Sequence, residues 1–550
     1  MSSSSTTPTS CIQLKDKIDL TDKERRIFDK LLQVVRHCNL KTKVRVVGGW
    51  VRDKLLGKES TDIDIALDDM TGKQFCEKVN EYLAFVGEKK QKIHVIESNN
   101  SKHLQAAKMK LMGVSFDFVN LRKETFNENS RIPSVEYGSA EEDACRRDLT
   151  INSLFYDIQE KIVEDFTGRG IADLKAGRIV TPLPAMDTFK DDPLRVFRAI
   201  RFAARFGFVL DDELREAAAS DAVREAIGLK MSRERISDEI KLIMSGNRPV
   251  QALTDICSLQ LFWVFFALPE PNASDRPRDR RFVGSGDAAW NSVASVDAAW
   301  NCVASVDTAW NLLELIGFSS FDEKQRRLYL YSALLIPITR EIGYCIIPKY
   351  LTRPNDEAVM VKWLHRASER FTSLIPELTN TAEAAAREKP DLTVTSNLPV
   401  SAGLLLWDIE NAGKKKTDTE RLSLWRVALM ISTLSYPINF DRSEGSADKH
   451  KQIELSTRRT LFATIEKAIV KLGVENVCDM PLAEGKQVIE VLQLKEGGSI
   501  VGVWMTKLLE WQLADLSRTS EQSLEWMRER ASERPELKYD EQQVSALSIW

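Results

Sequence analysis

The segment Val44–Asp69 constrains the fold of this chain more than any other part of the sequence. It reads VRVVGGWVRDKLLGKESTDIDIALDD. A β-branched run ends in two glycines and passes into residues with helical spacing, and a second apolar run follows after Gly57. This pattern predicts a strand, a tight glycine turn, a short helix and a second strand.

Two carboxylates lie at the start of the second predicted strand. Side chains alternate along a strand, so Asp62 and Asp64 project from one face while Ile63 and Ile65 point into a core. Carboxylates held this close repel one another unless a cation lies between them. Magnesium prefers hard oxygen ligands, often one or two carboxylates together with substrate phosphates. Asp62 and Asp64 are therefore candidate catalytic residues and metal ligands.

The glycine turn suggests a phosphate site beside these acids. Gly48 and Gly49 precede the short helix, where backbone N–H groups can approach a phosphate closely. Arg52 in the first turn could contact the same phosphate. Alone, two alternating aspartates are a common solvated strand end, and two glycines are a common turn. Their combination in this order predicts a site for metal-assisted phosphoryl or nucleotidyl transfer.

The segment GGWVRDKLLGKESTDIDIAL resembles the signature of class II tRNA nucleotidyltransferases, the CCA-adding enzymes of the polymerase β superfamily. The flanking segments resemble eukaryotic members, and plant members most. The resemblance covers residues 40–246 and implies two bound magnesium ions.

Composition restricts the class of protein further. The chain has 550 residues, which predicts several domains. Its formal net charge of −4 gives no overall basic character, so contacts with nucleic acid must come from local basic patches. Eight cysteines are scattered without a CxxC pair, which favours a reduced compartment and no structural zinc. No apolar run has the length of a membrane span.

The residues after Asp69 predict the rest of a small mixed sheet with helices on one side. Helical spacing is found from Leu20 to Cys38 and from Gly72 to Leu83, and strand-like alternation in Val114–Val119. In that last strand Asp117 faces away from Phe116 and Phe118. It is a candidate third metal ligand, or a simple strand-edge acid.

A polar stretch, Asn127–Asp143, is predicted to be a mobile loop, and Asp148 or Thr150 to cap a helix containing Leu149, Leu154 and Phe155. Arginines at a helix start can form a surface ion pair. The segment Arg146–Asn152 also matches the RRDxxxN motif of the resembled family. That resemblance assigns Arg147 and Asp148 to the ribose of an incoming nucleotide and Asn152 to its triphosphate side.

A second informative stretch begins at Asp191. Pro193 favours a helix start, and four arginines recur at steps of three or four residues on one helix face: Arg195, Arg198, Arg201 and Arg205. A solvated basic face is the usual explanation of such a row. The run resembles the family motif EDxxR, with Asp191 in place of Glu. By resemblance, Asp192 and Arg195 hydrogen-bond the Watson–Crick edge of CTP or ATP, and Arg198 and Arg201 approach the triphosphate.

A later segment, Ser232–Ile240, resembles a family segment of structural role that pins helices by ion pairs. Beyond residue 250 the sequence is mostly helical. A ten-residue repeat, DAAWN at 287 and 297 and DTAWN at 307, is too short for a solenoid and has no assigned function.

The expected fold is α+β, a polymerase β-type nucleotidyltransferase head followed by an all-α neck, body and tail. The expected divisions are a disordered N-terminus over residues 1–19, the head over 20–175, a nucleotide-selecting neck over 176–250, and a helical body and tail over 251–550, where tRNA would bind.

The expected function is template-free addition of C, C and A to the 3′ end of tRNA from CTP and ATP. The expected partners are the tRNA acceptor end and these two nucleotides, with no membrane and no stable protein partner. Alternatives are a poly(A) polymerase or a partial CC- or A-adding enzyme of the same family, a small-molecule nucleotidyltransferase, or an inactive RNA-binding protein. The expected location is the cytoplasm or nucleus, with mitochondrial or plastid isoforms possible.

Overall fold

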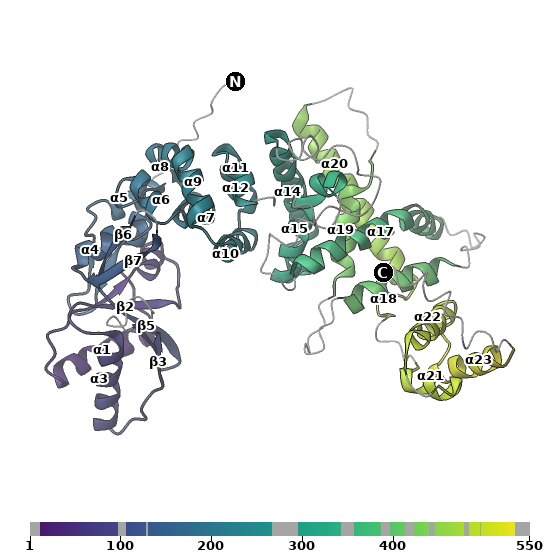
Figure 1. Ribbon diagram of the computed structural model, residues 1–550, viewed down its shortest axis with the longest axis horizontal. Coiled ribbons are helices and arrows are strands. Elements are labelled where there is room, and N and C mark those ends of the chain that lie inside the picture. Colours follow the sequence, from purple (N-terminus) through teal and green to yellow (C-terminus); the bar gives the residue numbers. More distant parts are fainter. Residues whose placement is uncertain are drawn as a thin grey trace. The chain divides into compact units, whose positions relative to one another are not determined.

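The computed structural model describes residues 12–96, 106–127, 130–266, 295–342, 357–386, 397–412, 423–438, 446–477, 483–494 and 497–533. The chain divides into two compact units, Met1–Leu268 (unit 1) and Pro269–Trp550 (unit 2). Unit 1 combines sheets with helices, and every described regular element of unit 2 is helical (Figure 1). The predicted α+β class is confirmed.

A seven-stranded mixed sheet forms the first part of unit 1, in the order β3-β4-β5-β2-β1-β8-β9. Neighbouring strands are antiparallel except β2 and β5, which are parallel. The elements of this part are α1 (Asp22–His37), β1 (Val44–Val47), α2 (Gly49–Leu55), β2 (Ile63–Leu67), α3 (Gly72–Phe85), β3 (Ile93–Ile96), β4 (Ala106–Leu111), β5 (Val114–Asn120), β6 (Arg122–Asn127), β7 (Ser130–Tyr137), α4 (Ala140–Cys145), the 3-10 turn η1 (Thr150–Asn152), β8 (Phe155–Asp157) and β9 (Ile162–Glu164).

The strand, glycine turn, helix and strand predicted from Val44–Asp69 are present as β1, α2 and β2. All four residues of β1 are buried, as are Ile63 and Ile65 of β2. Gly48 has φ +78°, a conformation that L side chains rarely adopt, so a glycine is required where β1 turns into α2. After this turn α2 packs against β1 and β2.

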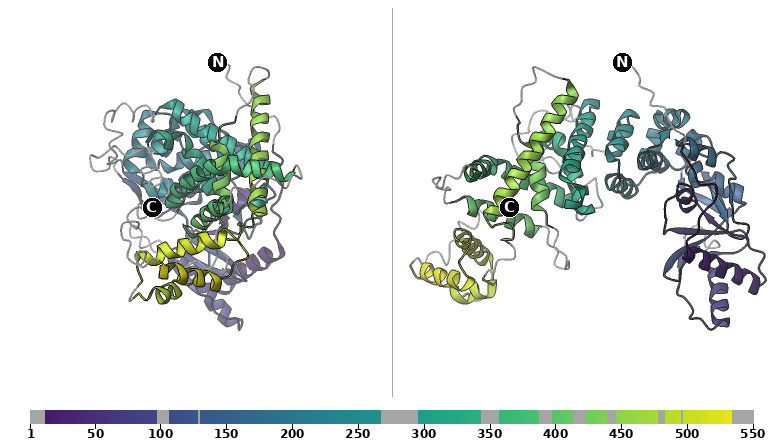
Figure 2. Two further views of the ribbon diagram at one scale, coloured as in Figure 1. Left: turned by 90° about the vertical axis from the view of Figure 1, so that its right-hand side faces the viewer. Right: turned by 180° about the vertical axis from the view of Figure 1, so that it is seen from behind.

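One face of the sheet is covered by α3, which packs against β4 and β5, and α1 packs on α3 (Figure 2). Phe75 of α3 and Phe118 of β5 are fully buried, with ring centroids 5.5 Å apart. Both helices begin with a capping box, at Thr21 and Thr71. The buried face of β5 holds the strand in place and leaves Asp117 on the opposite face.

The prediction of a mobile loop over residues 127–143 was wrong. Ser130–Tyr137 forms β7, which pairs with β6 as a separate two-stranded ribbon, and α4 follows directly. Pro133 misled the interpretation because proline interrupts a ladder. Here it falls in the irregular part of the register between Thr125 and Asn127, where strands tolerate proline.

The helix predicted after Asp148 is also wrong. Only the 3-10 turn η1 forms, and Phe155 begins β8. The carboxylate of Asp148 accepts hydrogen bonds from the backbone N–H of Leu149 and from the side chain of Asn152, a local arrangement that competes with a helix. Pairing of β8 with β1 then fixes the segment as a strand.

Helices make up most of the remainder of unit 1. The elements are α5 (Gly170–Ala176), β10 (Arg178–Ile179), α6 (Ala185–Asp191), α7 (Leu194–Phe206), β11 (Val209–Leu210), α8 (Asp212–Ala218), α9 (Asp221–Lys230), α10 (Arg233–Met244), α11 (Pro249–Ser258) and α12 (Phe262–Phe265). Val196, Phe197 and Ile200 of α7 are fully buried, and α10 and α11 pack against α7. The arginine-bearing helix predicted from the sequence is therefore central to this bundle.

Unit 2 consists of helices with their own buried residues. Its described elements are α14 (Val296–Ile316), the 3-10 turn η3 (Phe318–Ser320), α15 (Glu323–Ile342), α17 (Glu357–Ala386), α18 (Leu398–Ala412), α19 (Trp425–Ser435), α20 (Ala447–Lys471), α21 (Gly485–Leu492), α22 (Ser499–Leu513) and α23 (Ser520–Glu533). The second and third copies of the ten-residue repeat lie in α14, and the first lies outside the described residues.

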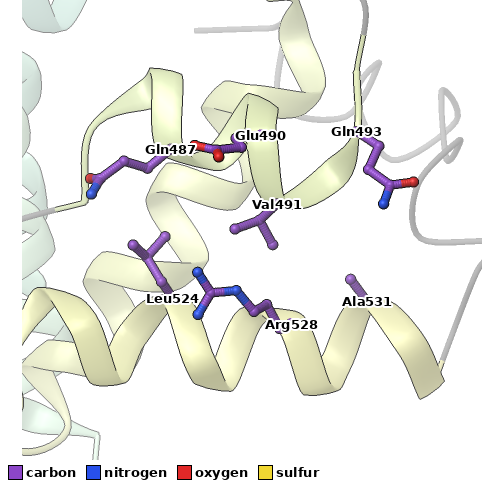
Figure 3. Close-up of a pocket in the computed structure, with 7 residues that line it drawn as sticks. All are labelled: Gln487, Glu490, Val491, Gln493, Leu524, Arg528 and Ala531. Atoms are coloured by element: carbon purple, nitrogen blue, oxygen red, sulfur yellow. The ribbon is translucent and has the colours of Figure 1, made fainter.

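The last three helices, α21, α22 and α23, enclose a small core around Trp504 and Met527. A cleft of about 470 Å³ lies between α21 and α23, lined by Gln487, Glu490, Val491, Gln493, Leu524, Arg528 and Ala531 (Figure 3). Among the described residues, no helix is long and apolar enough to cross a membrane.

Candidate active site

Three carboxylates meet on one face of the sheet. The parallel register of β2 and β5 sets Asp64 opposite Asp117, and Asp62 immediately precedes β2. One oxygen from each of these residues lies within 4.8 Å of the others. The alternation that buries Ile63, Ile65, Phe116 and Phe118 on the other face produces this cluster.

Burial and mutual repulsion dominate the electrostatics of the cluster. Burial, followed by the charges of Asp62 and Asp117, raises the pKa of Asp64 to about 6, although Arg147 and Lys108 act in the opposite direction. Lys108 of β4 pairs with Asp117 at 3.1 Å across the strand register. The three acids thus form a set of hard oxygen donors with too little positive charge around Asp64.

Arg147 lies beside the glycine turn. A Cβ atom at Gly48 would be 3.2 Å from its guanidinium, so the missing side chain leaves room for the arginine. Asp143 of α4 accepts hydrogen bonds from Arg147 at 2.8 and 3.0 Å. Arginines 146 and 147 both pair with Asp143, and despite its burial they hold the pKa of this carboxyl below its usual range.

Arg52 lies in a buried contact rather than in an open position. Only 3% of it is exposed, and its guanidinium pairs with Asp53 at 2.8 Å and donates a hydrogen bond to the side chain of Asn152. Its guanidinium carbon lies 4.7 Å from the ring centroid of Phe206. Arg52 therefore joins α2 to the end of α7.

Asp148 connects the sheet to α7 more directly. Its carboxylate accepts a hydrogen bond from Arg198 at 2.7 Å and another from Asn152 at 3.1 Å. Burial would raise the pKa of Asp148, but the charge of Arg198 and these hydrogen bonds hold it below its ordinary value. The carboxyl of Asp148 is therefore ionised at neutral pH, and its hydrogen bonds to Arg198 and Asn152 hold it in place.

The start of α7 is fixed by two further contacts. Arg195 donates a hydrogen bond to the backbone carbonyl of Arg146 at 2.6 Å. Asp192 accepts two hydrogen bonds from Arg235 of α10, at 3.0 and 2.9 Å. Farther along α7, Arg201 pairs with Glu239 of α10 at 2.7 Å.

The segment of residues 146–148 brings the predicted site residues together. Arg147 lies beside Gly48 and influences Asp64, while the neighbouring positions hold Arg195 and Arg198. Residues 146–148 therefore connect α7 to the glycine turn, which directly follows Val47, the strand partner of Asp64. Asp192 is adjacent to this chain through the start of α7, although its own carboxylate faces Arg235.

Sequence reasoning did not single out several residues that hold the site together. Lys108 pairs with Asp117, and Asp143 pairs with Arg147. Arg235 and Glu239, in contrast, lie in the segment that was predicted to pin helices by ion pairs, and they pair with Asp192 and Arg201. Alternation along β4 could have placed Lys108 beside Asp117. The spacing of Arg235 and Glu239, four residues apart on one helix, matches a face directed at the α7 arginines. Asp143 was interpreted as the end of a loop, and nothing in the sequence around it indicated that it pairs with Arg147.

The comparisons with known proteins define the class first. Residues 44–180 match the family model described as the poly A polymerase head domain. This range contains the glycine turn, the carboxylate cluster and the segment of residues 146–148. This part of unit 1 is therefore similar to the poly A polymerase head domain.

The curated relatives with similar sequences include tRNA nucleotidyltransferases. The chain is 48% identical over 263 residues to the mitochondrial CCA tRNA nucleotidyltransferase of Saccharomyces cerevisiae, covering 46% of this chain and 48% of the relative. It is 39% identical over 256 residues to the tRNA nucleotidyltransferase cca1 of Schizosaccharomyces pombe, covering 45% and 51%. The chain spans about half the length of the curated relatives it matches. The predicted eukaryotic affinity is confirmed, and the likeness to plant members stays a prediction.

A solved structure extends the likeness in fold. The CCA-adding enzyme of Bacillus stearothermophilus in complex with CTP has a TM-score of 0.54 and 17% identity, with 94% of this chain and all of that chain covered. Similarity of fold therefore extends beyond unit 1.

Proposed function

We propose that this chain is a CCA tRNA nucleotidyltransferase that adds C, C and A to the 3′ end of tRNA from CTP and ATP. One observation carries the proposal: the carboxylate cluster of Asp62, Asp64 and Asp117 is joined through residues 146–148 to the arginine-bearing helix α7. Identity to tRNA nucleotidyltransferases over about half of the chain supports it. The expected division into head, neck and tRNA-binding body is part of the proposal.

The carboxylate cluster is suited to a divalent metal. Its three acids offer oxygen donors within 4.8 Å of one another, and the raised pKa of Asp64 reflects negative charge that a cation would relieve. We propose magnesium, with two ions expected, held by Asp62 and Asp64 and also by Asp117. When bound, the metal supplies charge stabilisation to the oxygens of the triphosphate and of the leaving pyrophosphate.

The residues of the chain would bind and orient the nucleotide. In this proposal Gly48 and Gly49 allow backbone N–H groups to approach the triphosphate, and Arg147 adds a positive charge at the same turn. Asp148 keeps acceptor capacity beside its bonds to Arg198 and Asn152 and can accept from a ribose hydroxyl. The 3′-oxygen of the tRNA then joins the α-phosphorus, and pyrophosphate leaves.

The start of α7 would select the base. Cytosine and adenine both carry an exocyclic amine, which donates a hydrogen bond to a carboxylate. A guanidinium donates hydrogen bonds to a ring nitrogen or carbonyl. Asp192 and Arg195 supply this pair. Arg235 occupies one side of the Asp192 carboxylate and fixes its plane. Arg198 and Arg201 are proposed to approach the triphosphate, and the buried Arg52 to hold the side chain of Asn152 on that side.

The proposal is tested with tRNA that lacks its CCA end and with each nucleotide supplied separately. The expected result is addition of two C residues from CTP alone, addition of A only after them, and no addition from UTP or GTP. Extension of unrelated RNA with A alone would instead show that the chain is a poly(A) polymerase, the enzyme named in the description of the family model. Absence of any incorporation would contradict both assignments.

The location of the chain is also a proposal. Two curated relatives of comparable similarity are mitochondrial enzymes, which supports a mitochondrial form. We propose the cytoplasm and nucleus as further locations, with a plastid form possible.

A further inference from the structure

A basic cleft in unit 1 contains none of the three clustered carboxylates, and of its lining residues only Arg201 belongs to the proposed nucleotide site. It has a volume of about 140 Å³, several times the roughly 30 Å³ that a water molecule occupies in the liquid. Its lining comes from α7, α10 and α11 and the turn between the last two, and consists of Arg201, Ala204, Arg205, Leu242, Ile243, Gly246, Asn247, Arg248 and Ala252. Three guanidinium groups therefore share one small cleft.

The positive charge of this cleft is only partly balanced. Arg201 pairs with Glu239, a carboxylate that also lies 4.0 Å from Arg198. Arg205 lies 3.6 Å from Asp53, which already pairs with Arg52. Among the described residues, Arg248 has no carboxylate within ion-pair distance. Positive charge is thus in excess where Arg205 and Arg248 meet.

Arg248 is exposed and lies beside the C-terminal end of α7. Its guanidinium lies against Gly207, where an added Cβ atom would be 2.0 Å from one of its nitrogens. Asn247 donates a hydrogen bond to the backbone carbonyl of Arg205 at 3.3 Å and so ties the α10–α11 turn to α7. Arg248 is also the N-cap of the ten-residue helix α11, whose first turn has no side-chain cap and adds partial positive charge.

We propose that this cleft binds a phosphate group, with Arg205 and Arg248 as its ligands and Leu242 and Ala252 as its walls. The inference rests on the proposed function, because that function supplies two sources of phosphate. The chemistry is the same for both: a planar guanidinium donates to phosphate oxygens. The source that we favour is the backbone of the RNA substrate, since an open cleft on the surface suits a continuous chain. Free pyrophosphate is the other source.

The test measures binding of tRNA lacking its CCA end to the full-length chain, without nucleotide, by fluorescence anisotropy at several salt concentrations. Arg248→Gln is compared with Leu242→Glu, which places a carboxylate at the wall from a residue that is 50% exposed. Arg224→Gln is the matched control, because it removes one charge from α9 of the same unit outside the cleft. Binding of pyrophosphate to the same proteins is measured by calorimetry.

If the cleft binds an RNA phosphate, both cleft variants bind RNA roughly fivefold more weakly at low salt, and the slope of log affinity against log salt falls by about 1. Arg224→Gln leaves both quantities unchanged. Weaker pyrophosphate binding with unchanged RNA binding supports the phosphate site and assigns the free anion as its source. Unchanged binding of both overturns the inference, as does a lowered melting temperature of Arg248→Gln with unchanged binding, which would make Arg248 a structural cap of α7. Incorporation by the parent protein tests the proposed function separately, so the two failures are distinguishable.

Discussion

At the residue scale, Asp64 is a carboxylate that the fold holds close to two other carboxylates. It lies on a strand whose other face is packed into the core, and its oxygens lie beside those of Asp62 and Asp117. Burial and these two neighbours raise its pKa to about 6. Such an arrangement costs free energy in the absence of a cation and is typical of functional sites.

Replacement of Asp62 or Asp64 by Asn is expected to lower nucleotide incorporation at least about a hundredfold, because the charge that would hold the metal is lost. The measurement is the initial rate of CMP addition to tRNA at saturating magnesium. Asp29→Asn, which changes an exposed carboxylate of α1, should leave the rate unchanged. Full activity in both site variants would refute the metal assignment.

The pKa of Asp64 predicts a specific dependence of stability on pH. Its folded value of about 6 lies above the unfolded value of 3.8, so the folded state binds the proton more tightly, and metal-free stability falls as pH rises from about 4 to about 6. Asp64→Asn should therefore raise the metal-free melting temperature at pH 7, by an amount corresponding to about 3 kcal/mol, and change it little at pH 4. A melt in EDTA at both pH values checks this. A variant less stable than the parent at pH 7 would contradict it.

Helix α7 is the element on which nucleotide selection depends. Its buried face fixes its position, and its first three arginines are engaged: Arg195 with the Arg146 carbonyl, Arg198 with Asp148, and Arg201 with Glu239. The solvated basic face that is usual for such a row is therefore not what this helix presents. The contacts instead orient its first turn relative to the carboxylate cluster.

Arg235→Gln is expected to weaken base selection while retaining the metal site. With both hydrogen bonds to Asp192 altered, the carboxylate loses its fixed plane, and the ratio of kcat/KM for CTP over UTP should fall roughly tenfold. Arg235→Lys should restore part of the ratio. Arg224→Gln serves as the control. An unchanged ratio with a lowered melting temperature would show that Arg235 only stabilises the bundle.

The sequence was sufficient to predict elements whose pattern is local. The strand, turn, helix and strand of Val44–Asp69 and the helix α7 follow from alternation, glycines and helical spacing. Elements decided by distant pairing were missed. The strand β8 pairs with β1, and β7 pairs with β6 across an irregular register between Thr125 and Asn127. Asp192 and Arg235 are 43 residues apart, and the spacing of neither residue indicates the other.

At the scale of the whole molecule, the candidate active site occupies only one of the two compact units. All predicted site residues lie in unit 1, and unit 2 has its own buried helices and a cleft between α21 and α23. Identity to curated relatives covers about half of the chain, while likeness in fold covers more.

A fragment comprising Met1–Leu268 is therefore expected to fold cooperatively and to bind CTP with an affinity within about threefold of the full chain, because unit 1 contains its own core and every proposed nucleotide ligand. Its affinity for tRNA should fall more than tenfold if unit 2 binds the RNA. Calorimetry with CTP and anisotropy with tRNA check the two halves of the prediction. Loss of CTP binding by a folded fragment would contradict the assignment of the nucleotide site to unit 1.

The most direct test is to incubate a tRNA lacking CCA with the full chain, magnesium, CTP and ATP together. The 3′ ends of the products are then determined by sequencing. The account predicts products that end in CCA and extend no further, and none with Asp62→Asn or Asp64→Asn. Products ending in runs of A, or CCA ends formed by both variants at the parent rate, would contradict it.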